Sequence, residues 1–388
     1  MSAPRVFSYV QYLQGIGHLY RAAHIAAAMV EAGLGVDLVS GGMPVPKVSP
    51  ENVTLHQLPP IRCRDGDFSD LVNALGAPLD DAYRDHRRDE LLGLFRRQQP
   101  QILIVEAFPF GRRQMRFELL PLLEAAVNAS PRPVVVCSVR DILQVREKPG
   151  RDQETLDLLN TYFDHVVVHG DPDFAPLEAT FPRTREIRDK IHYTGLVGVF
   201  AEDAPVSCGD DRGEILVSAG GGATRSEVLL SLAMKARALS SAKDRPWRLL
   251  YGTNLPEEAL TGLMADLPEG VTLEPNRSRA EFLDLLAACS LSVSQAGYNT
   301  VTDILHCGCR AVLAPYSARG ETEQLHRARR MEELKLAHIV EAEQLSAESL
   351  AQAVDAALAA PPPARFPIDV RGAERSAELI LSWLENQN

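Results

Sequence analysis

The most constraining feature of this sequence is a regular alternation between short β-rich runs and segments of helix length. In the first half, runs such as RVFSYVQYL, QILIVEAF and RPVVVCSV are separated by segments whose apolar residues recur at helical spacing. This alternation is typical of a parallel sheet covered by helices on both faces. It therefore predicts an α/β fold built from doubly wound, Rossmann-like parallel sheets.

The chain is long enough for two such sheets. It has 388 residues, and single hydrophobic cores stop growing at roughly 250 to 300 residues. The alternation pauses over residues 195–213, which are rich in Gly, Pro and Asp, and then resumes. We predict an N-terminal domain over residues 1–198, a linker over 199–212, a second domain over 213–370, and a final helix over 371–388 that packs back toward the first domain. Two domains of this kind would face each other across a cleft at the carboxyl ends of their strands.

Composition and charge exclude several classes of function. A net charge of −12 argues against a nucleic-acid-binding protein. The first half is the less acidic, because residues 1–199 hold 22 basic and 25 acidic residues, so it is better suited to an acidic acceptor or an anionic membrane surface. The sequence shows no secretory signal and no apolar run of the ~18 residues that a membrane span needs. We expect a cytoplasmic protein, either soluble or peripheral to the inner face of the membrane.

The cysteines and arginines give weaker indications. The six cysteines contain no C-x-x-C pair, so we expect free thiols and no metal site. A helix predicted within residues 80–100 carries arginines at positions 84, 87, 88, 96 and 97. These form either a basic face for a membrane or an ordinary solvated surface, and the second interpretation is the simpler.

The first of three glycine-rich turns joins a strand to a helix in QGIGHLYR. The third glycine of a dinucleotide-binding motif is replaced by Tyr20, and no acidic residue ends the next strand. These differences argue against a nicotinamide or flavin cofactor. His18 lies at the helix start, where a helix favours anions and an imidazole suits acid/base chemistry. The alternative is a structural histidine in a tight turn.

The second turn is SAGGGATRSE. Gly220, Gly221 and Gly222 lie between a buried strand and a helix, so their bare backbone can wrap a diphosphate. Thr224 and Arg225 could add side-chain contacts. No G-K-[ST] follows, so the turn is not a P-loop.

The third turn, in SQAGYNTVTDIL, opens a helix at Gly297. Asn299 and Thr300 occupy its first turn, and Asp303 follows one helical turn after Asn299, where a carboxylate can accept the hydroxyls of a ribose. A polar loop further along could bind the hydroxyls of a hexose; its side chains are Glu321, Glu323 and Gln324. The alternative is that Asp303 only stabilises its helix dipole and that the loop is a solvated surface.

A candidate catalytic carboxylate lies outside these turns. In LIVEAFPFGRRQMRF, Glu106 ends a strand of the first domain, at the edge where His18 is expected. The loop that follows could recognise an acceptor that carries phosphate or carboxylate; it contains Phe108, Phe110, Arg112 and Arg113. The competing interpretation is a buried structural glutamate paired with an arginine.

These motifs together resemble the GT-B glycosyltransferases, most closely glycosyltransferase family 28 and a related bacterial group of predicted glycosyltransferases. The resemblance rests on GIGHLYRA, SAGGGA and SQAGYNTVTDIL…APY…ETEQLHRA. It implies a GT-B fold whose second domain binds a UDP-sugar. The implied donor-binding residues are Gly220, Gly221 and Gly222 with Thr224 at the diphosphate, Arg277 and Phe282 at the uracil, Gly297, Asn299, Thr300 and Asp303 toward the ribose, and Glu323 and Gln324 at the sugar. The implied acceptor or phosphate side comprises Gly15, Gly17, Arg21, Phe108, Arg112 and Arg113.

The function implied by the resemblance is an inverting, metal-independent transfer of a hexose or N-acetylhexosamine from a UDP-sugar to a small-molecule or lipid-linked acceptor. His18 would be the general base, and Glu106 would orient it or replace it. No cofactor is expected beyond the UDP-sugar as co-substrate. A UDP-sugar hydrolase, a 2-epimerase and a non-catalytic nucleotide-sugar sensor are the alternatives. The acceptor, the sugar, the oligomeric state and a peripheral membrane contact through the N-terminal domain stay open.

Overall fold

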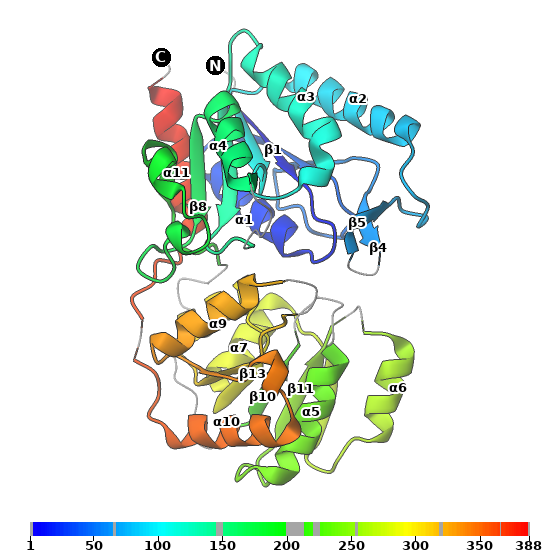
Figure 1. Cartoon of the computed structure of the whole chain (residues 1–388), viewed down its shortest axis with the longest axis vertical. Helices are drawn as coiled ribbons and strands as arrows, with labels where there is room; N and C mark the ends of the chain where they lie inside the picture. Colours follow the sequence, from blue (N-terminus) through cyan, green and yellow to red (C-terminus); the bar gives the residue numbers. More distant parts are fainter. Residues whose placement is uncertain are drawn as a thin grey trace. The chain divides into compact units, whose positions relative to one another are not determined.

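The computed structural model describes residues 3–64, 67–144, 150–198, 213–219, 226–252, 255–317, 321–364 and 366–386. The chain divides into two compact units (Figure 1). Unit 1 comprises Met1–Gly198 and Asp369–Asn388, and unit 2 comprises Val199–Ile368. Each unit is built on a parallel sheet with helices, so the predicted α/β class is confirmed. The predicted linker, residues 199–212, lies outside the described residues.

Unit 1 contains a seven-stranded parallel sheet in the order β3-β2-β1-β6-β7-β8-β9. Its strands are β1 Arg5–Val10, β2 Gly35–Ser40, β3 Thr54–Gln57, β6 Ile102–Glu106, β7 Val134–Arg140, β8 His165–His169 and β9 Ile191–Tyr193. The chain leaves β1 in one direction through β2 and β3 and then returns to pair β6 with the other edge of β1. This reversal creates a topological switch point between β1 and β6, the position where open α/β sheets bind ligands.

Helices cover both faces of this sheet. They are α1 Gly17–Glu31, α2 Asp81–Gln98, α3 Arg116–Val127, α4 Arg151–Tyr162 and α11 Gly372–Glu385, with short 3-10 helices η1 Arg113–Met115, η2 Leu177–Ala179 and η3 Thr184–Lys190. Alternate residues of β6 enter different cores. Ile102 and Ile104 pack with α1 and α11, whereas Leu103 and Val105 pack with α2 and α3. A small antiparallel hairpin, β4 Arg62–Arg64 and β5 Asp67–Val72, completes the unit.

The last helix of the chain belongs to the core of unit 1. Helix α11 packs along α1, and the ring of Trp383 stacks on His165 of β8 with 3.9 Å between ring centroids. The chain enters this helix beside Gly195, whose φ is +82° and where a Cβ atom would lie 2.5 Å from the carbonyl oxygen of Asp369. Only glycine fits that crossing without strain. The C-terminal segment therefore completes the face of the sheet that α1 begins.

Unit 2 repeats the architecture on a smaller scale. Its six parallel strands are β10 Ile215–Ser218, β11 Trp247–Tyr251, β12 Val271–Pro275, β13 Leu291–Ser294, β14 Ala311–Leu313 and β15 His338–Ile339, in the order β12-β11-β10-β13-β14-β15. Its helices are α5 Ser226–Leu239, α6 Glu257–Ala265, α7 Arg279–Ala288, α8 Tyr298–Cys307, α9 Glu323–Glu333 and α10 Ala347–Ala359, with the 3-10 helix η5 Ala342–Gln344. The switch point lies between β10 and β13.

The interpretation of the α2 arginines as a solvated surface is wrong for Arg87, which is fully buried. Its Nε donates to Glu118 Oε2 of α3 at 2.6 Å, and its Nη2 donates to Gln11 Oε1 after β1 at 2.6 Å. Its Nη1 also donates to the backbone oxygen of Gly41 at 2.9 Å. Arg87 precedes the buried Leu91 by four residues, so the helical period turns it toward the core. This ion pair ties α2 and α3 to the loops that follow β1 and β2.

Arg87→Ala should destabilise unit 1 by about 3 to 5 kcal/mol, because it leaves the Glu118 carboxylate buried without its counter-charge. Arg84→Ala is the matched control on the same helix, since Arg84 makes only an exposed pair with Asp81 and should change stability by less than about 1 kcal/mol. Urea unfolding followed by Trp383 fluorescence, in a common Trp247→Phe background, measures the difference. Equal midpoints for the two variants would contradict this role of Arg87.

Candidate active site

Two side chains of the predicted site meet at the β1/β6 switch point of unit 1. Glu106 is the last residue of β6, and His18 is the second residue of α1. His18 Nδ1 lies 2.9 Å from Glu106 Oε1. The Glu106 side chain is 4% exposed and the His18 side chain is 12% exposed. The imidazole therefore lies at the boundary between a buried carboxylate and the outside.

Arg21 lies one helical turn beyond His18 and contacts the same carboxylate. Its Nη2 donates to Glu106 Oε1 and lies 3.4 Å from His18 Nδ1. Arg21 was predicted on the phosphate side of the site. That prediction is wrong, because Arg21 is buried and forms an ion pair with Glu106. Glu106 is therefore a buried carboxylate paired with an arginine, as the competing interpretation expected, and it also contacts His18.

The surroundings set opposite charge preferences for the two groups. Burial lowers the pKa of His18 well below 6.5, and the nearby charges of Arg140, Arg112 and Arg21 lower it further. Burial alone would raise the pKa of Glu106, but the charge of Arg21 and the hydrogen bonds from His18 and Ser138 hold that pKa well below its usual value. The site thus combines a neutral imidazole with an ionised carboxylate.

This pairing fixes which nitrogen of His18 can act as a base. An ionised carboxylate only accepts hydrogen bonds, so His18 Nδ1 must carry the proton that it donates to Glu106 Oε1. The lone pair is then on Nε2, for which the described part of the chain provides no hydrogen-bond partner. A neutral imidazole with a free Nε2 is what general-base catalysis requires.

The loop after Glu106 differs from its prediction. The assignment of Phe108 to an acceptor surface is wrong, because its ring is fully buried in the unit 1 core together with Phe110. Arg113 pairs with Glu154 of α4 and donates to a backbone oxygen of that helix. Arg112 has a positive φ of 58° and donates through Nε to the Gln11 backbone oxygen at 2.6 Å. Its charge lowers the pKa of His18, so Arg112 acts on the imidazole electrostatically.

Two glycines of the predicted site leave open space around the backbone. Neither Gly15, before α1, nor Gly297, which caps α8, has a positive φ, and a Cβ atom at either position would meet no atom of the described residues within 4 Å. Gly17 is the first residue of α1. Packing among the described residues therefore does not explain why Gly15 and Gly297 are glycines. The close approach of a ligand to the backbone would explain it.

Most of the predicted diphosphate turn lies outside the described residues, namely Gly220, Gly221, Gly222, Thr224 and Arg225. The segment after β13 lies within the described residues. Asn299 and Thr300 are half-buried there in the first turn of α8, whose N-terminus has no side-chain cap.

Asp303 lies on α8, but its carboxylate is paired with a residue that sequence reasoning missed. Arg279 of α7 donates from Nη1 to Asp303 Oδ2 at 2.7 Å and from Nη2 to Oδ1. Burial raises the pKa of Asp303 to about 7, against the lowering effect of the Arg279 charge. No local motif marks Arg279, because the contact joins two helices that are far apart along the chain. A ribose at Asp303 would have to share this carboxylate with Arg279.

Gln324 connects the loops that follow β13 and β14. Its Oε1 accepts hydrogen bonds from the backbone N–H of Ala296 at 3.2 Å and of Tyr316 at 3.1 Å. Arg327, three residues further along α9, is buried and donates to the Ala296 backbone oxygen at 3.1 Å. Both side chains therefore hold the loop that leads into Gly297.

Glu321 lies in the same polar loop and is half-buried. Glu321 accepts from the Gln324 backbone N–H through Oε1, while its Oε2 is buried without a hydrogen-bond partner among the described residues. Burial raises the pKa of Glu321 to about 7, and the charge of Glu323 raises it further. A carboxyl oxygen of this kind is available to a sugar hydroxyl.

The two residues assigned to the uracil lie near the start of α7. Arg277 pairs with Glu274, and Phe282 is half-buried in the first part of the helix. Ser278 and Glu281 form a capping box that begins this helix. The structure therefore places both residues near the N-terminal end of α7.

The described ranges contain no group of three or more His, Cys, Asp or Glu side chains arranged to hold a metal ion. None of the helices in these ranges combines the length and apolar character needed to cross a bilayer.

Comparison with known proteins identifies the architecture. Residues 216–367 match the model of the glycosyltransferase family 28 C-terminal domain. The second half of the chain is therefore similar to the family 28 C-terminal domain, and the chain has the GT-B fold. Among solved structures, Acinetobacter baumannii MurG is 16% identical with a TM-score of 0.59, covering 98% of this chain and 100% of its own. No curated protein sequence matches this chain.

Two other structures of similar fold contain ligands. Phytolacca americana UGT2, complexed with UDP-2fluoro-glucose and pterostilbene, is 16% identical with a TM-score of 0.61, covering 99% of this chain and 94% of its own. The spinosyn rhamnosyltransferase SpnG, complexed with thymidine diphosphate, is 13% identical with a TM-score of 0.59, covering 99% of this chain and 96% of its own. At these identities the likeness concerns the fold.

The raised pKa of Asp303 predicts a pH dependence of stability. The folded chain holds this proton more tightly than the unfolded chain, so its contribution to stability is lost as pH rises from the usual pKa of 3.8 through about 7. The stability of Asp303→Asn relative to the wild type should therefore increase over that interval. Urea unfolding followed by Trp247 fluorescence in a common Trp383→Phe background measures it. Asp284→Asn, an exposed change on α7, should show no such trend; a flat difference for Asp303→Asn would contradict the assignment.

Proposed function

We propose that this glycosyltransferase moves a hexose or N-acetylhexosamine from a UDP-sugar to an acceptor hydroxyl, with inversion and with His18 as the general base. The observation that carries this proposal is the neutral His18 imidazole, bonded through Nδ1 to the ionised Glu106 at 2.9 Å, at the switch point of the unit 1 sheet. Such an imidazole can take a proton at Nε2 while the carboxylate stabilises the resulting charge.

The proposed step is a single displacement. The acceptor oxygen forms a bond to the anomeric carbon as the bond from that carbon to the diphosphate oxygen breaks. The acceptor proton moves to His18 Nε2, and UDP leaves with the electron pair. Glu106 accepts hydrogen bonds from His18, Arg21 and Ser138, which suits it to orient the imidazole rather than to attack the sugar. A single attack on the opposite side of the anomeric carbon inverts its configuration.

Unit 2 would bind the donor. The uncapped start of α8, with open space at Gly297, offers backbone N–H groups and a helix dipole to the diphosphate. These groups, together with the glycine turn at residues 220–222, would stabilise the charge of the leaving UDP, so we propose a reaction that needs no metal ion. The carboxylates of Asp303 and Glu321 would accept sugar hydroxyls. The nucleotide ligands of UGT2 and SpnG support a nucleoside diphosphate sugar as the donor class.

A nucleotide panel tests the donor site. UDP and UDP-sugars should raise the melting temperature of the wild-type protein more than TDP, GDP or ADP at equal concentration, because a ligand that binds the folded state stabilises it. Asp303→Ala should weaken UDP binding about tenfold to a hundredfold through loss of a charge-assisted hydrogen bond. Asp284→Ala removes an exposed acidic group from the same unit and should bind UDP normally. Unchanged affinity in Asp303→Ala would place the ribose elsewhere.

Kinetics test the base. His18→Ala should lower kcat by about 10² to 10⁴-fold, and Glu106→Gln should lower it as well. Because burial and neighbouring arginines lower the pKa of His18, the acid limb of the wild-type profile should lie below pH 6.5; activity is lost only when His18 becomes protonated. His86→Ala, which removes a histidine that is 71% exposed, is the control. Near-normal turnover of His18→Ala would refute the assignment.

Hydrolysis is the main rival activity, since water could take the place of the acceptor. Incubation with a UDP-sugar alone separates the two. Rapid UDP release without an acceptor would identify a hydrolase, interconversion of sugars an epimerase, and binding without turnover a sensor. Persistence of transfer in EDTA would support the metal-independent step, and its loss would overturn that part of the proposal.

A further inference from the structure

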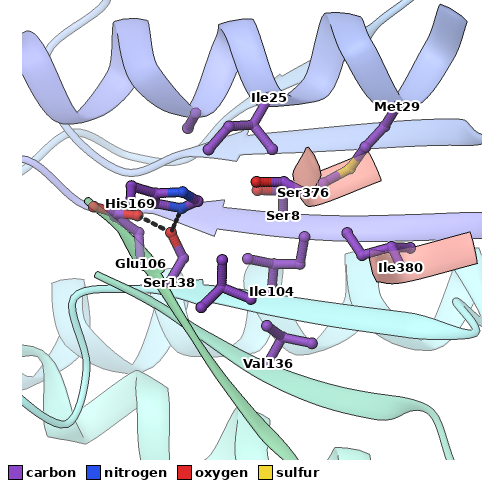
Figure 2. Close-up of a pocket in the computed structure, with 12 residues that line it drawn as sticks. Ser8, Ile25, Met29, Ile104, Glu106, Val136, Ser138, His169, Ser376 and Ile380 are labelled. Atoms are coloured by element: carbon purple, nitrogen blue, oxygen red, sulfur yellow. Dashed lines mark hydrogen bonds between the residues drawn. The ribbon is translucent and has the colours of Figure 1, made fainter. Parts of the chain in front are cut away.

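A chain of buried polar side chains continues behind Glu106, across three further strands of unit 1. Ser138 of β7 donates to Glu106 Oε2 at 2.5 Å, and Ser138 Oγ lies 3.0 Å from His169 Nε2 of β8. His169 Nδ1 lies 3.0 Å from the hydroxyl of Thr194, just after β9. Figure 2 shows Ser138 between Glu106 and His169. The general-base proposal uses only the hydrogen bond from Ser138 to Glu106 and makes no use of His169 or Thr194.

The direction of every hydrogen bond in this chain follows from the ionised state of Glu106. Since the carboxylate can only accept, the Ser138 hydroxyl must use its proton on Oε2. Ser138 Oγ must then accept from His169, so the proton of His169 is on Nε2. His169 Nδ1 in turn accepts from Thr194. Burial lowers the pKa of His169 to about 3, and the charge of Arg21 adds to this, which keeps the ring neutral and limits it to this one tautomer.

The strand register and the surrounding core hold this chain in place. Ser138 pairs with Glu106 in the β6/β7 register, and the Ala107 backbone N–H donates to the Ser138 backbone oxygen at 2.8 Å. A cavity lined by Glu106, Ser138 and His169 continues between apolar side chains of α1 and α11, among them Ile25 and Ile380 (Figure 2). This cavity of about 20 Å³ has room for about one water molecule and is too small for bulk solvent.

We propose that Ser138 and His169 are positioning residues that fix Glu106 and, through it, the Nδ1–H tautomer of His18. Ser138 occupies Oε2 and leaves Oε1 to His18 and Arg21, while His169 keeps the Ser138 hydroxyl pointing at the carboxylate. The tautomer is a property of the resting protein. Only its consequence for rate rests on the proposed function.

The proposal has a directional consequence for His18. The charged groups that face its ring are Glu106 from β6, Arg21 from α1, Arg112 after β6 and Arg140 at the end of β7. Loss of the Ser138 hydroxyl frees the Glu106 carboxylate to rotate away from His18 Nδ1, so the hydrogen bond that raises the pKa of the imidazole weakens and that pKa falls. The acid limb of the activity profile should therefore move to lower pH, a shift that a purely structural role would not produce.

The experiment compares Ser138→Ala with Ser138→Thr, which keeps the hydroxyl and has the neighbouring cavity to receive its methyl group. His169→Phe and His169→Gln form a second pair, since glutamine can still donate to Ser138. Long-range ¹H–¹⁵N spectra of histidine-labelled protein report the tautomer, with His18 assigned by the signal missing from His18→Ala. The wild type and the two conservative variants should show the Nδ1–H form of His18. Ser138→Ala and His169→Phe should show a mixture of tautomers.

The kinetic readout is separate. In Ser138→Ala, kcat should fall about tenfold, the rate equivalent of one hydrogen bond to a charged group, with the donor KM unchanged and the acid limb shifted to lower pH. An Nε2–H tautomer of His18 in the wild type, or an unchanged tautomer in both Ser138→Ala and His169→Phe, would overturn the proposal. If no donor is turned over but the tautomers behave as expected, the proposed function fails while the positioning role stands.

Discussion

An ionised carboxylate that is almost fully buried imposes the strictest condition on this structure. Glu106 is 3% exposed, and an isolated charge at such a site is strongly unfavourable unless donors surround it. Its donors come from elements that are separate in the chain: His18 and Arg21 from α1, and Ser138 from β7. The carboxylate can remain charged only when the β1/β6 and β6/β7 pairings and α1 are all in register. The chemistry of the site is thus coupled to the assembly of the sheet.

The same condition is met differently in unit 2. Asp303 is equally buried, yet its main donor is a single arginine, and its pKa lies near 7 rather than far below the usual value. Glu321 also has a pKa near 7 and a buried oxygen without a partner among the described residues. Unit 1 therefore holds a carboxylate whose hydrogen bonds are already satisfied, whereas unit 2 holds carboxylates whose capacity to accept is partly unused. The first arrangement suits a fixed orienting group, and the second suits groups that bind a ligand.

Sequence reasoning predicted the features that local patterns encode. The β/α alternation predicted both parallel sheets, and the placement of His18 after β1 and of Glu106 at the end of β6 predicted that they share an edge, because parallel strands end together. The pairings that hold these residues were not predictable, since Arg21, Ser138 and Arg279 find their partners through tertiary contacts. Arg87 shows a further limit: its charge suggested exposure, but the spacing from Arg87 to Leu91 carried the stronger signal. Phe108 was misassigned because an aromatic residue in a loop can belong to the core.

The C-terminal helix has a consequence for how the protein is made. Trp383 and the rest of α11 complete the core of unit 1, although unit 2 lies between them and the rest of that unit in the chain. During synthesis on the ribosome, the first sheet emerges long before the helix that covers it. Its face beside α1 must therefore wait, with apolar residues such as Val36 and Ile104 incompletely covered, until the final residues leave the exit tunnel. Domains usually fold in the order in which they are translated, but here the N-terminal unit can reach its final state only after the whole of the second has been synthesised.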